Sequence, residues 1–126
     1  MRQLLYVSSS TKTPVGEALS TILVQSRRNN AIGGLTGLLW TDGSRFLQVL
    51  EGDHNAVERA FDRIAADPRH KAVVVLHDRV VQERTFGRWS MALVGDGEER
   101  IADALAHADP VVRGTFEGLI EARRAA

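Results

Sequence analysis

Two apolar segments on either side of a short polar turn constrain the fold of this chain most strongly. Residues 35–40 and 45–51 are rich in leucine, valine and aromatic side chains, and Thr41-Asp42-Gly43-Ser44 lies between them. Apolar runs of this length around an Asp-Gly turn are typical of an antiparallel β-hairpin. The sequence therefore predicts two neighbouring strands joined at residues 41–44.

A primary amide lies inside the second of these strands. Gln48 is surrounded by Phe46, Leu47, Val49 and Leu50. An amide has two donors and two acceptor lone pairs, and burying it without partners costs roughly 1–3 kcal/mol. Tyr6, the only tyrosine, lies in another short apolar run near the N-terminus. Two hydrogen-bonding side chains on two expected core strands indicate a polar ligand held inside the domain.

The remaining elements follow from periodicity and from turn residues. Besides the hairpin, we expect strands over residues 3–8, 72–76 (able to continue to 81) and 89–93. We expect one helix from about Pro14 to Asn29, after a polar turn at residues 11–14, and a second from the capping residue Asp53 to about residue 67. The resulting order β-α-β-β-α-β-β predicts an α+β, ferredoxin-like sheet with two helices on one face.

The C-terminal quarter of the chain has a different composition. Beyond Gly95-Asp96-Gly97, residues 98–106 and 110–124 have the pattern of two short helices separated by Asp109-Pro110. We therefore divide the 126 residues into a ligand-binding domain over 1–95 and a helical extension over 96–126. Such an extension can cover the second face of the sheet, form a subunit contact or carry an output.

Composition excludes several classes of protein. Sixteen basic and sixteen acidic side chains cancel, which argues against binding that depends on neutralising nucleic-acid phosphates. The chain has no cysteine, so disulfides, thiolate metal sites and thiol catalysis are excluded. We find neither a signal-peptide core nor an apolar stretch of about 20 residues, and we expect a cytoplasmic protein without membrane contact.

Most of the polar candidates also have a purely structural interpretation. Asn30 extends the buried stripe of the first helix, but Asn29 or Asn30 can equally cap the end of that helix. Arg63 and Asp67 have the spacing of a solvated helical ion pair. Trp89 and Met91 have the character of core residues, and a buried tyrosine commonly bonds a backbone carbonyl. Each candidate is weak when it is taken alone.

Taken together, these segments closely resemble one known family. The segments are Tyr6 with Ser8, residues 26–30 (Ser-Arg-Arg-Asn-Asn), 35–39 (Leu-Thr-Gly-Leu-Leu), 46–52 (Phe-Leu-Gln-Val-Leu-Glu-Gly), 67–70 (Asp-Pro-Arg-His) and 84–91. This pattern resembles the BLUF family of blue-light sensors that use FAD, and the resemblance extends from about residue 2 to residue 94. The stretch from Asn30 to Gly52 is its most specific part.

The resemblance implies a flavin standing between the two helices over the sheet. Its polar edge would face Tyr6, Gln48 and Asn30. The family pattern also places flavin contacts at Ser8, Asn29, Arg63, Asp67, Arg69 and His70, and apolar walls at Ile32, Leu38, Phe46 and Leu50. FAD is the cofactor that the resemblance implies, and the same ring contacts would hold FMN or riboflavin.

The resemblance also implies a photochemical mechanism and no enzymatic activity. Light would drive an electron and then a proton from Tyr6 to the flavin, with Gln48 relaying the proton. Gln48 would be left reoriented or as a tautomer, and the protein would be in a reversible red-shifted state. Trp89 and Met91, competing for space near Gln48, would pass this change to residues 96–126. Val7 and Trp40 depart from the family pattern without touching the photoactive pair.

Three other functions are compatible with a small α+β domain, and the sequence also bears on two kinds of partner. A ferredoxin-like module that binds a ligand or protein without photochemistry is the main rival. A flavin oxidoreductase would need a dinucleotide fingerprint of the Gly-x-Gly-x-x-Gly type, which we do not find. An RNA-binding domain would need aromatics on its central strands and a basic surface, and we find neither. We expect the signal to pass to a separate downstream effector protein or through a change of oligomer. Apolar residues on both strand faces, such as Leu47 and Val49, favour a homodimer.

Overall fold

The computed structural model describes residues 1–11, 17–94 and 99–125. Its sheet has five strands in the order β4-β1-β3-β2-β5. The elements are β1 (Arg2–Ser10), α1 (Glu17–Gly33), β2 (Thr36–Thr41), β3 (Arg45–Gly52), α2 (His54–Ala66), β4 (His70–Val80), β5 (Ala92–Leu93), α3 (Glu99–Ala106) and α4 (Pro110–Ala125). This order confirms the expected α+β, ferredoxin-like fold with a helical tail.

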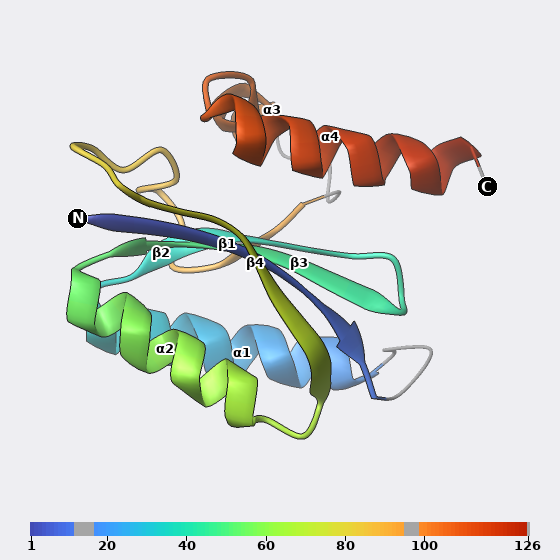
Figure 1. Cartoon of the computed structure of the whole chain (residues 1–126), viewed down its shortest axis with the longest axis horizontal. Coiled ribbons are helices and arrows are strands. Elements are labelled where there is room, and N and C mark those ends of the chain that lie inside the picture. Colours follow the sequence, from blue (N-terminus) through green and yellow to red (C-terminus); the bar gives the residue numbers. More distant parts are fainter. Residues whose placement is uncertain (12–16, 95–98, 126) are drawn as a thin grey trace.

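The sheet is covered on both faces (Figure 1). Helices α1 and α2 lie on one face, and α3 and α4 lie on the other. Each face has its own core. The core under α1 and α2 contains Leu4, Leu23, Phe46, Leu50, Val57 and Met91, and the core under the tail helices contains Leu5, Leu38, Leu47, Val49, Phe86 and Phe116. Leu47 and Val49 are thus buried by the chain's own tail rather than by a second copy.

The two long helices differ from expectation mainly at their ends. Asp53 caps α2 as expected, because its side chain accepts a hydrogen bond from the backbone N–H of Asn55. Helix α1 continues to Gly33, so both asparagines lie inside it, and the interpretation of either as a cap is wrong. Gly34, with φ of 69°, follows the helix in the left-handed conformation that ends many helices. The start expected at Pro14, the turn before it and the domain boundary at 95/96 lie outside the described residues.

The last strand is shorter than the predicted residues 89–93. Only Ala92–Leu93 is a strand, and it pairs in parallel with Leu38 and Leu39 of β2. The residues before it bind other groups through their backbone carbonyls. The carbonyl of Ser90 accepts from the Asn30 amide, and that of Met91 accepts from Arg27. Side chains of α1 therefore hold this segment, while the Trp89 carbonyl still accepts from the backbone N–H of Gly37 in β2.

Gly37 permits the close approach of β2 and β3. A Cβ atom at this position would lie 1.9 Å from the carbonyl oxygen of Val49, which belongs to the neighbouring backbone. Because a backbone atom cannot move aside as a side-chain end can, we expect Gly37→Ala to lower the free energy of unfolding by about 3 kcal/mol in urea titrations. Gly114→Ala in α4 is the matched control. No atom lies within 4 Å of its added Cβ, so a neutral or stabilising effect is expected there.

Candidate functional site

A cavity of about 420 Å³ lies between α1, α2 and the sheet. This volume is within the range of small-molecule sites, roughly 300–1,000 Å³. The cavity brings together eight of the residues that the sequence singled out, namely Tyr6, Asn29, Asn30, Gln48, Arg63, Asp67, Arg69 and His70. Ile22, Gln25, Ser26, Arg28, Leu39, Ala60 and Ile64 complete its lining. The cavity is therefore the candidate ligand site.

Strand pairing places Tyr6 directly beside Gln48. The two residues are register partners between β1 and β3, so their side chains emerge on the same face of the sheet. Both are buried, and the Tyr6 hydroxyl donates a hydrogen bond to Gln48 Oε1. Burial, with a smaller effect of the nearby Asp67 carboxylate, raises the pKa of Tyr6 far above its ordinary value. The phenol therefore stays protonated and acts as a donor to the amide.

The amide nitrogen of Gln48 faces a different partner. Gln48 Nε2 lies 3.5 Å from the sulfur of Met91, a weak acceptor. Met91 is 2% exposed and belongs to the core under α1 and α2, whereas Trp89 is half-buried and packs against the core under the tail. Gln48 thus connects a phenol on β1 to the segment that precedes β5. Met91, and not Trp89, occupies the inner position in this structure.

Asn30 also ties α1 to the segment before β5. Its side chain is 4% exposed, and Nδ2 donates to the carbonyl oxygen of Ser90 at 2.6 Å. Two turns of helix separate Asn30 from Leu23, which is buried in the core beneath α1, and this spacing directs both toward the sheet. Asn30 and Gln48 therefore bring two amides to the same cavity.

Charged groups gather at the α2–β4 end of the cavity. Asp67 binds Arg69 through both the side chain and the backbone N–H, and Arg69 also reaches Gln25 Oε1 at 2.8 Å. The Arg69 guanidinium lowers the pKa of the Asp67 carboxyl. The helical pair between Arg63 and Asp67 does not form, and among the described residues no carboxylate pairs with Arg63. Arg63 and Arg28 therefore present cations at the cavity rim.

His70 and Ser8 form a polar contact at the same end of the cavity. His70 Nδ1 lies 2.9 Å from the Ser8 hydroxyl, and its ring packs at 4.8 Å from the ring of Phe46. Burial lowers the pKa of His70, and this effect outweighs the attraction of the Asp67 carboxylate. His70 is consequently neutral at pH 7 and can act as one donor and one acceptor.

This burial predicts a dependence of stability on pH. Between the lowered pKa of folded His70 and its ordinary value of 6.5, the unfolded chain binds more protons than the native protein. The free energy of unfolding should therefore be largest above pH 6.5 and should fall as pH decreases below it. Urea titrations over this window should show a smaller decrease for His70→Gln. A matched change at the exposed His107 should leave the decrease as it is in the wild-type protein.

The expected apolar walls are only partly in place. Leu38 requires correction, because it lies in the core on the tail side of the sheet, and Leu39, which pairs with Gln48, lines the cavity instead. Ile32 is 82% exposed and lines a small neighbouring hollow with Asn29 and Arg63. Phe46 and Leu50 are buried on the cavity side of the sheet. Alternation along a strand places Leu38 and Leu39 on opposite faces.

The buried carboxylate of Glu51 was not predicted from the sequence. The Glu51 carboxylate is 0% exposed and accepts hydrogen bonds from Gln3 Nε2, Thr36 Oγ1 and the backbone N–H groups of Thr85 and Phe86. Arg84 lies in the same network and donates to the carbonyl oxygens of Glu51 and Gly34. Glu51 thus fixes the loop between β4 and β5. The signal was present, since a carboxylate inside an apolar strand is as unusual as the amide of Gln48.

Comparison with known proteins points to one family. The family described as sensors of blue-light using FAD (BLUF) matches residues 1–92. Photoactivated adenylate cyclase subunit beta from Euglena gracilis is 36% identical over 89 residues, which are 70% of this chain and 10% of the cyclase subunit. The blue light- and temperature-regulated antirepressor of Escherichia coli K12 is 35% identical over 80 residues, 64% of this chain and 20% of the antirepressor.

Solved structures give the same result at the level of the fold. The dark-state structure of BlrB, a BLUF protein, superimposes with a TM-score of 0.73 and 31% identity, covering 98% of this chain and 92% of BlrB. The ground state of BlsA superimposes with a TM-score of 0.71 and 30% identity over 89% of this chain and 76% of BlsA. The present chain spans only a small part of the curated relatives named above.

Proposed function

Because the chain belongs to the BLUF family, the sensors of blue light using FAD, we propose that Tyr6 and Gln48 form the photoactive pair of a flavin photoreceptor. The observation that carries this proposal is the buried hydrogen bond from the Tyr6 hydroxyl to Gln48 Oε1 in the wall of a ligand-sized cavity. The protein would sense light without transforming a substrate. We expect it to do so in the cytoplasm.

The chemistry of the cavity fits a flavin. Two amides, Gln48 and Asn30, can donate to and accept from the carbonyl and N–H groups along one edge of a flavin ring. Arg28, Arg63 and Arg69 line the cavity as well and suit a phosphate-bearing side chain. We therefore propose FAD as the natural cofactor, with FMN or riboflavin able to use the same ring contacts. Ser8 and Asn29 would add polar contacts at the two ends.

When bound, the flavin supplies absorption of blue light and, once excited, an acceptor for an electron and a proton. Tyr6 would donate both, because loss of an electron makes a phenol strongly acidic. Gln48 Oε1 already accepts the hydrogen bond of that phenol and so lies in position to relay the proton. After Tyr6 has regained its electron and proton, the Gln48 amide would stay turned or tautomeric and would hold the edge of the flavin with a changed hydrogen bond.

The turned amide would change its contact with Met91. In this structure an N–H group of Gln48 faces the Met91 sulfur. Exchange of the amide ends would place an oxygen there and remove the only donor that this sulfur has among the described groups. We propose that Met91 then shifts relative to Trp89, and that α3 and α4 respond because Trp89 packs against the core beneath them. The amide is the two-state element in this proposal.

Hydrogen exchange tests this route. Met91→Ala should keep the reversible spectral change but lose the light-dependent difference in amide exchange over α3 and α4, because the link from Gln48 to the tail is gone. Leu93→Ala, a truncation on β5 itself, is the matched control and should retain the difference. If Met91→Ala kept the full light-dependent difference in amide exchange over α3 and α4, the proposed role of Met91 would be wrong.

We propose that the output reaches a separate effector protein. The relatives named above include a cyclase and an antirepressor, so the family is coupled to different outputs. A homodimer remains our expectation, although Leu47 and Val49 are covered by the tail. The supporting surface is instead β4, where Val74, Leu76 and Val80 are all more than 40% exposed.

The test of the proposed function is the visible spectrum of the purified protein. We expect a flavin spectrum in the dark and a reversible shift to the red after blue light. A bound flavin that bleaches or does not shift would refute the Tyr6–Gln48 switch. A protein that binds no flavin would favour the ferredoxin-like module without photochemistry.

A further inference from the structure

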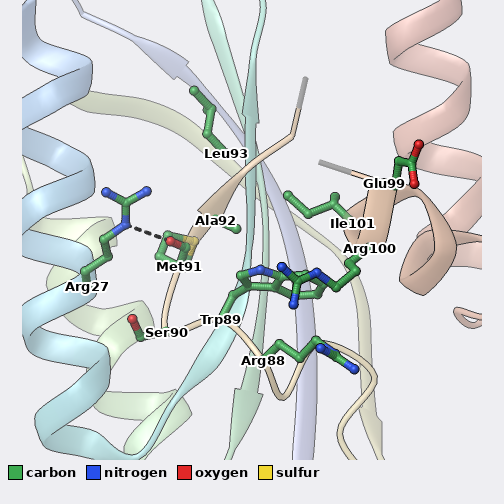
Figure 2. Close-up of a pocket in the computed structure, with 10 residues that line it drawn as sticks. All are labelled: Arg27, Arg88, Trp89, Ser90, Met91, Ala92, Leu93, Glu99, Arg100 and Ile101. Carbon is green, nitrogen blue, oxygen red and sulfur yellow. Dashed lines mark hydrogen bonds between the residues drawn. The ribbon is translucent and has the colours of Figure 1, made fainter. Parts of the chain in front are cut away.

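A second, larger cavity lies at the edge of the sheet, away from the Tyr6–Gln48 pair. Its volume is about 840 Å³, and it is formed by α1, the segment before β5, β5 itself and the start of α3. Figure 2 shows Arg27 reaching from α1 to the carbonyl of Met91, with Arg88 and Trp89 on the segment before β5 and Arg100 on α3. We call this hollow the β5 groove.

The β5 groove is strongly basic in a chain without net charge. It is lined by three arginines, Arg27, Arg88 and Arg100, and by one acidic residue, Glu99. Among the residues that the structure describes, neither Arg27 nor Arg88 pairs with a carboxylate. The Nε atom of Arg27 donates to the Met91 carbonyl at 2.9 Å, which holds this guanidinium at the groove. The groove therefore suits a ligand with several negative charges.

The floor of the groove is the edge of the sheet. β5 is the last strand in the order β4-β1-β3-β2-β5, and within the described ranges it pairs with β2 alone. An edge strand offers backbone donors and acceptors to an added strand, and this is a common mode of peptide recognition. Trp89 adds a half-buried aromatic surface of the kind that is enriched at interfaces.

We propose that the β5 groove binds an extended acidic segment of a partner protein, whose backbone adds to the outer edge of β5 and whose carboxylates pair with Arg27 and Arg88. The observations favour a peptide over a nucleic acid, because a chain without net charge lacks the wider positive field that nucleic-acid binding uses.

The same groove is connected to the photoactive pair through one residue. Met91 lines the β5 groove, and its sulfur also lies 3.5 Å from Gln48 Nε2. A movement of Met91 would change the backbone that Arg27 holds and hence the geometry of the groove. The proposal that a peptide binds in the dark depends only on the groove. The proposal that light changes this binding rests on the proposed function.

The experiment uses a fluorescein-labelled peptide that alternates valine and glutamate, and measures its anisotropy with the full chain in the dark and under blue light. The control peptide has lysine in place of glutamate. Arg27→Glu and Arg88→Glu remove groove charges, and Arg59→Glu, on the exposed surface of α2, is the matched control. A retained far-ultraviolet spectrum shows that each variant is folded.

We expect the acidic peptide to bind more weakly as salt is added, and each groove variant to weaken binding about tenfold, because an attraction becomes a repulsion. The lysine peptide should not bind, and Arg59→Glu should bind as the wild-type protein does. Blue light should change the affinity of the wild-type protein but not that of Gln48→Leu.

Several results would overturn the proposal. Equal affinities of Arg88→Glu and Arg59→Glu would show that the peptide binds elsewhere. Tighter binding of single-stranded oligothymidylate would assign the groove to nucleic acid, and self-association lost in Arg88→Glu would assign it to a second copy of the chain. Peptide binding in the dark by a protein that shows no red shift would support the peptide-binding proposal and refute the photochemical one. A red shift without peptide binding would refute the peptide-binding proposal alone.

Discussion

Replacing Gln48 with leucine should abolish the light-induced red shift while flavin remains bound. Leucine fills a similar volume but has no donor or acceptor. It can therefore neither relay the Tyr6 proton nor form a hydrogen bond to the flavin. The polar groups of Asn30, Arg63, Arg69 and His70 would still line the cavity. Difference spectra before and after blue light, with the ratio of flavin to protein measured in the same sample, check this expectation.

Gln25→Leu is the matched control for this variant. Gln25 lines the same cavity from α1, but its side chain accepts from Arg69, whereas the Tyr6 hydroxyl donates to Gln48. It should lower flavin affinity at most and retain the full spectral change. A normal red shift in Gln48→Leu would defeat the role assigned to Gln48, and loss of the shift in both variants would point to a general disturbance of the cavity.

Replacing Glu51 with alanine should cost about 4 kcal/mol of unfolding free energy, a large share of the roughly 5–15 kcal/mol of a typical domain. The substitution leaves the amide of Gln3 and the backbone N–H groups of Thr85 and Phe86 without their acceptor. Phe86 is itself fully buried, so release of this loop would also expose apolar surface. Urea titration of the dark protein measures the loss.

Two comparison variants test whether the loss of unfolding free energy comes from the buried hydrogen-bond network of Glu51. Glu51→Gln keeps one accepting oxygen but turns a donor toward other donors, so an intermediate loss is expected. Glu58→Ala removes a half-exposed carboxylate that pairs with Arg2, and such surface pairs contribute at most about 1 kcal/mol. If Glu51→Ala were no less stable than Glu58→Ala, the buried network would not hold the β4–β5 loop.

Much of the fold followed from local patterns in the sequence. The turn at residues 41–44 and the alternation around it gave the β2–β3 hairpin, and the spacing of Val57 and Ala60 gave the buried face of α2. The position of Tyr6 opposite Gln48 could be suspected because both are polar groups in apolar strands. Their contact nevertheless depends on the β1–β3 register, which no local pattern determines.

The features that sequence reasoning missed depend on contacts between distant segments. Leu39 rather than Leu38 lines the cavity because β2 pairs with β3 in a register that puts Leu39 opposite Gln48. The strand expected at residues 89–93 is shorter, and Arg27 and Asn30, far away in the sequence, bind the backbone of the segment before it from α1. Glu51 was overlooked because its partners are the backbone of a loop more than thirty positions later in the chain.

The helical tail limits where a signal can emerge. The described parts of the tail bury the face of the sheet that carries Leu5, Leu38 and Val49. In the proposed route, a change at Met91 can act on two neighbouring regions. One is the core beneath α3 and α4, which contacts Trp89, and the other is the β5 groove. The hydrogen-exchange and peptide-binding experiments separate these two routes, because the first measures the tail and the second measures the sheet edge.

The central claim is that light rearranges the Gln48 amide and strengthens its hydrogen bond to the flavin C4 carbonyl. Light-minus-dark infrared spectroscopy of the flavin-bound protein tests it most directly, because a stronger hydrogen bond lowers the stretching frequency of a carbonyl. We predict a reversible downshift of the C4 carbonyl band in the wild-type protein and no downshift in Gln48→Leu. A wild-type red shift with an unchanged C4 carbonyl band would contradict the account.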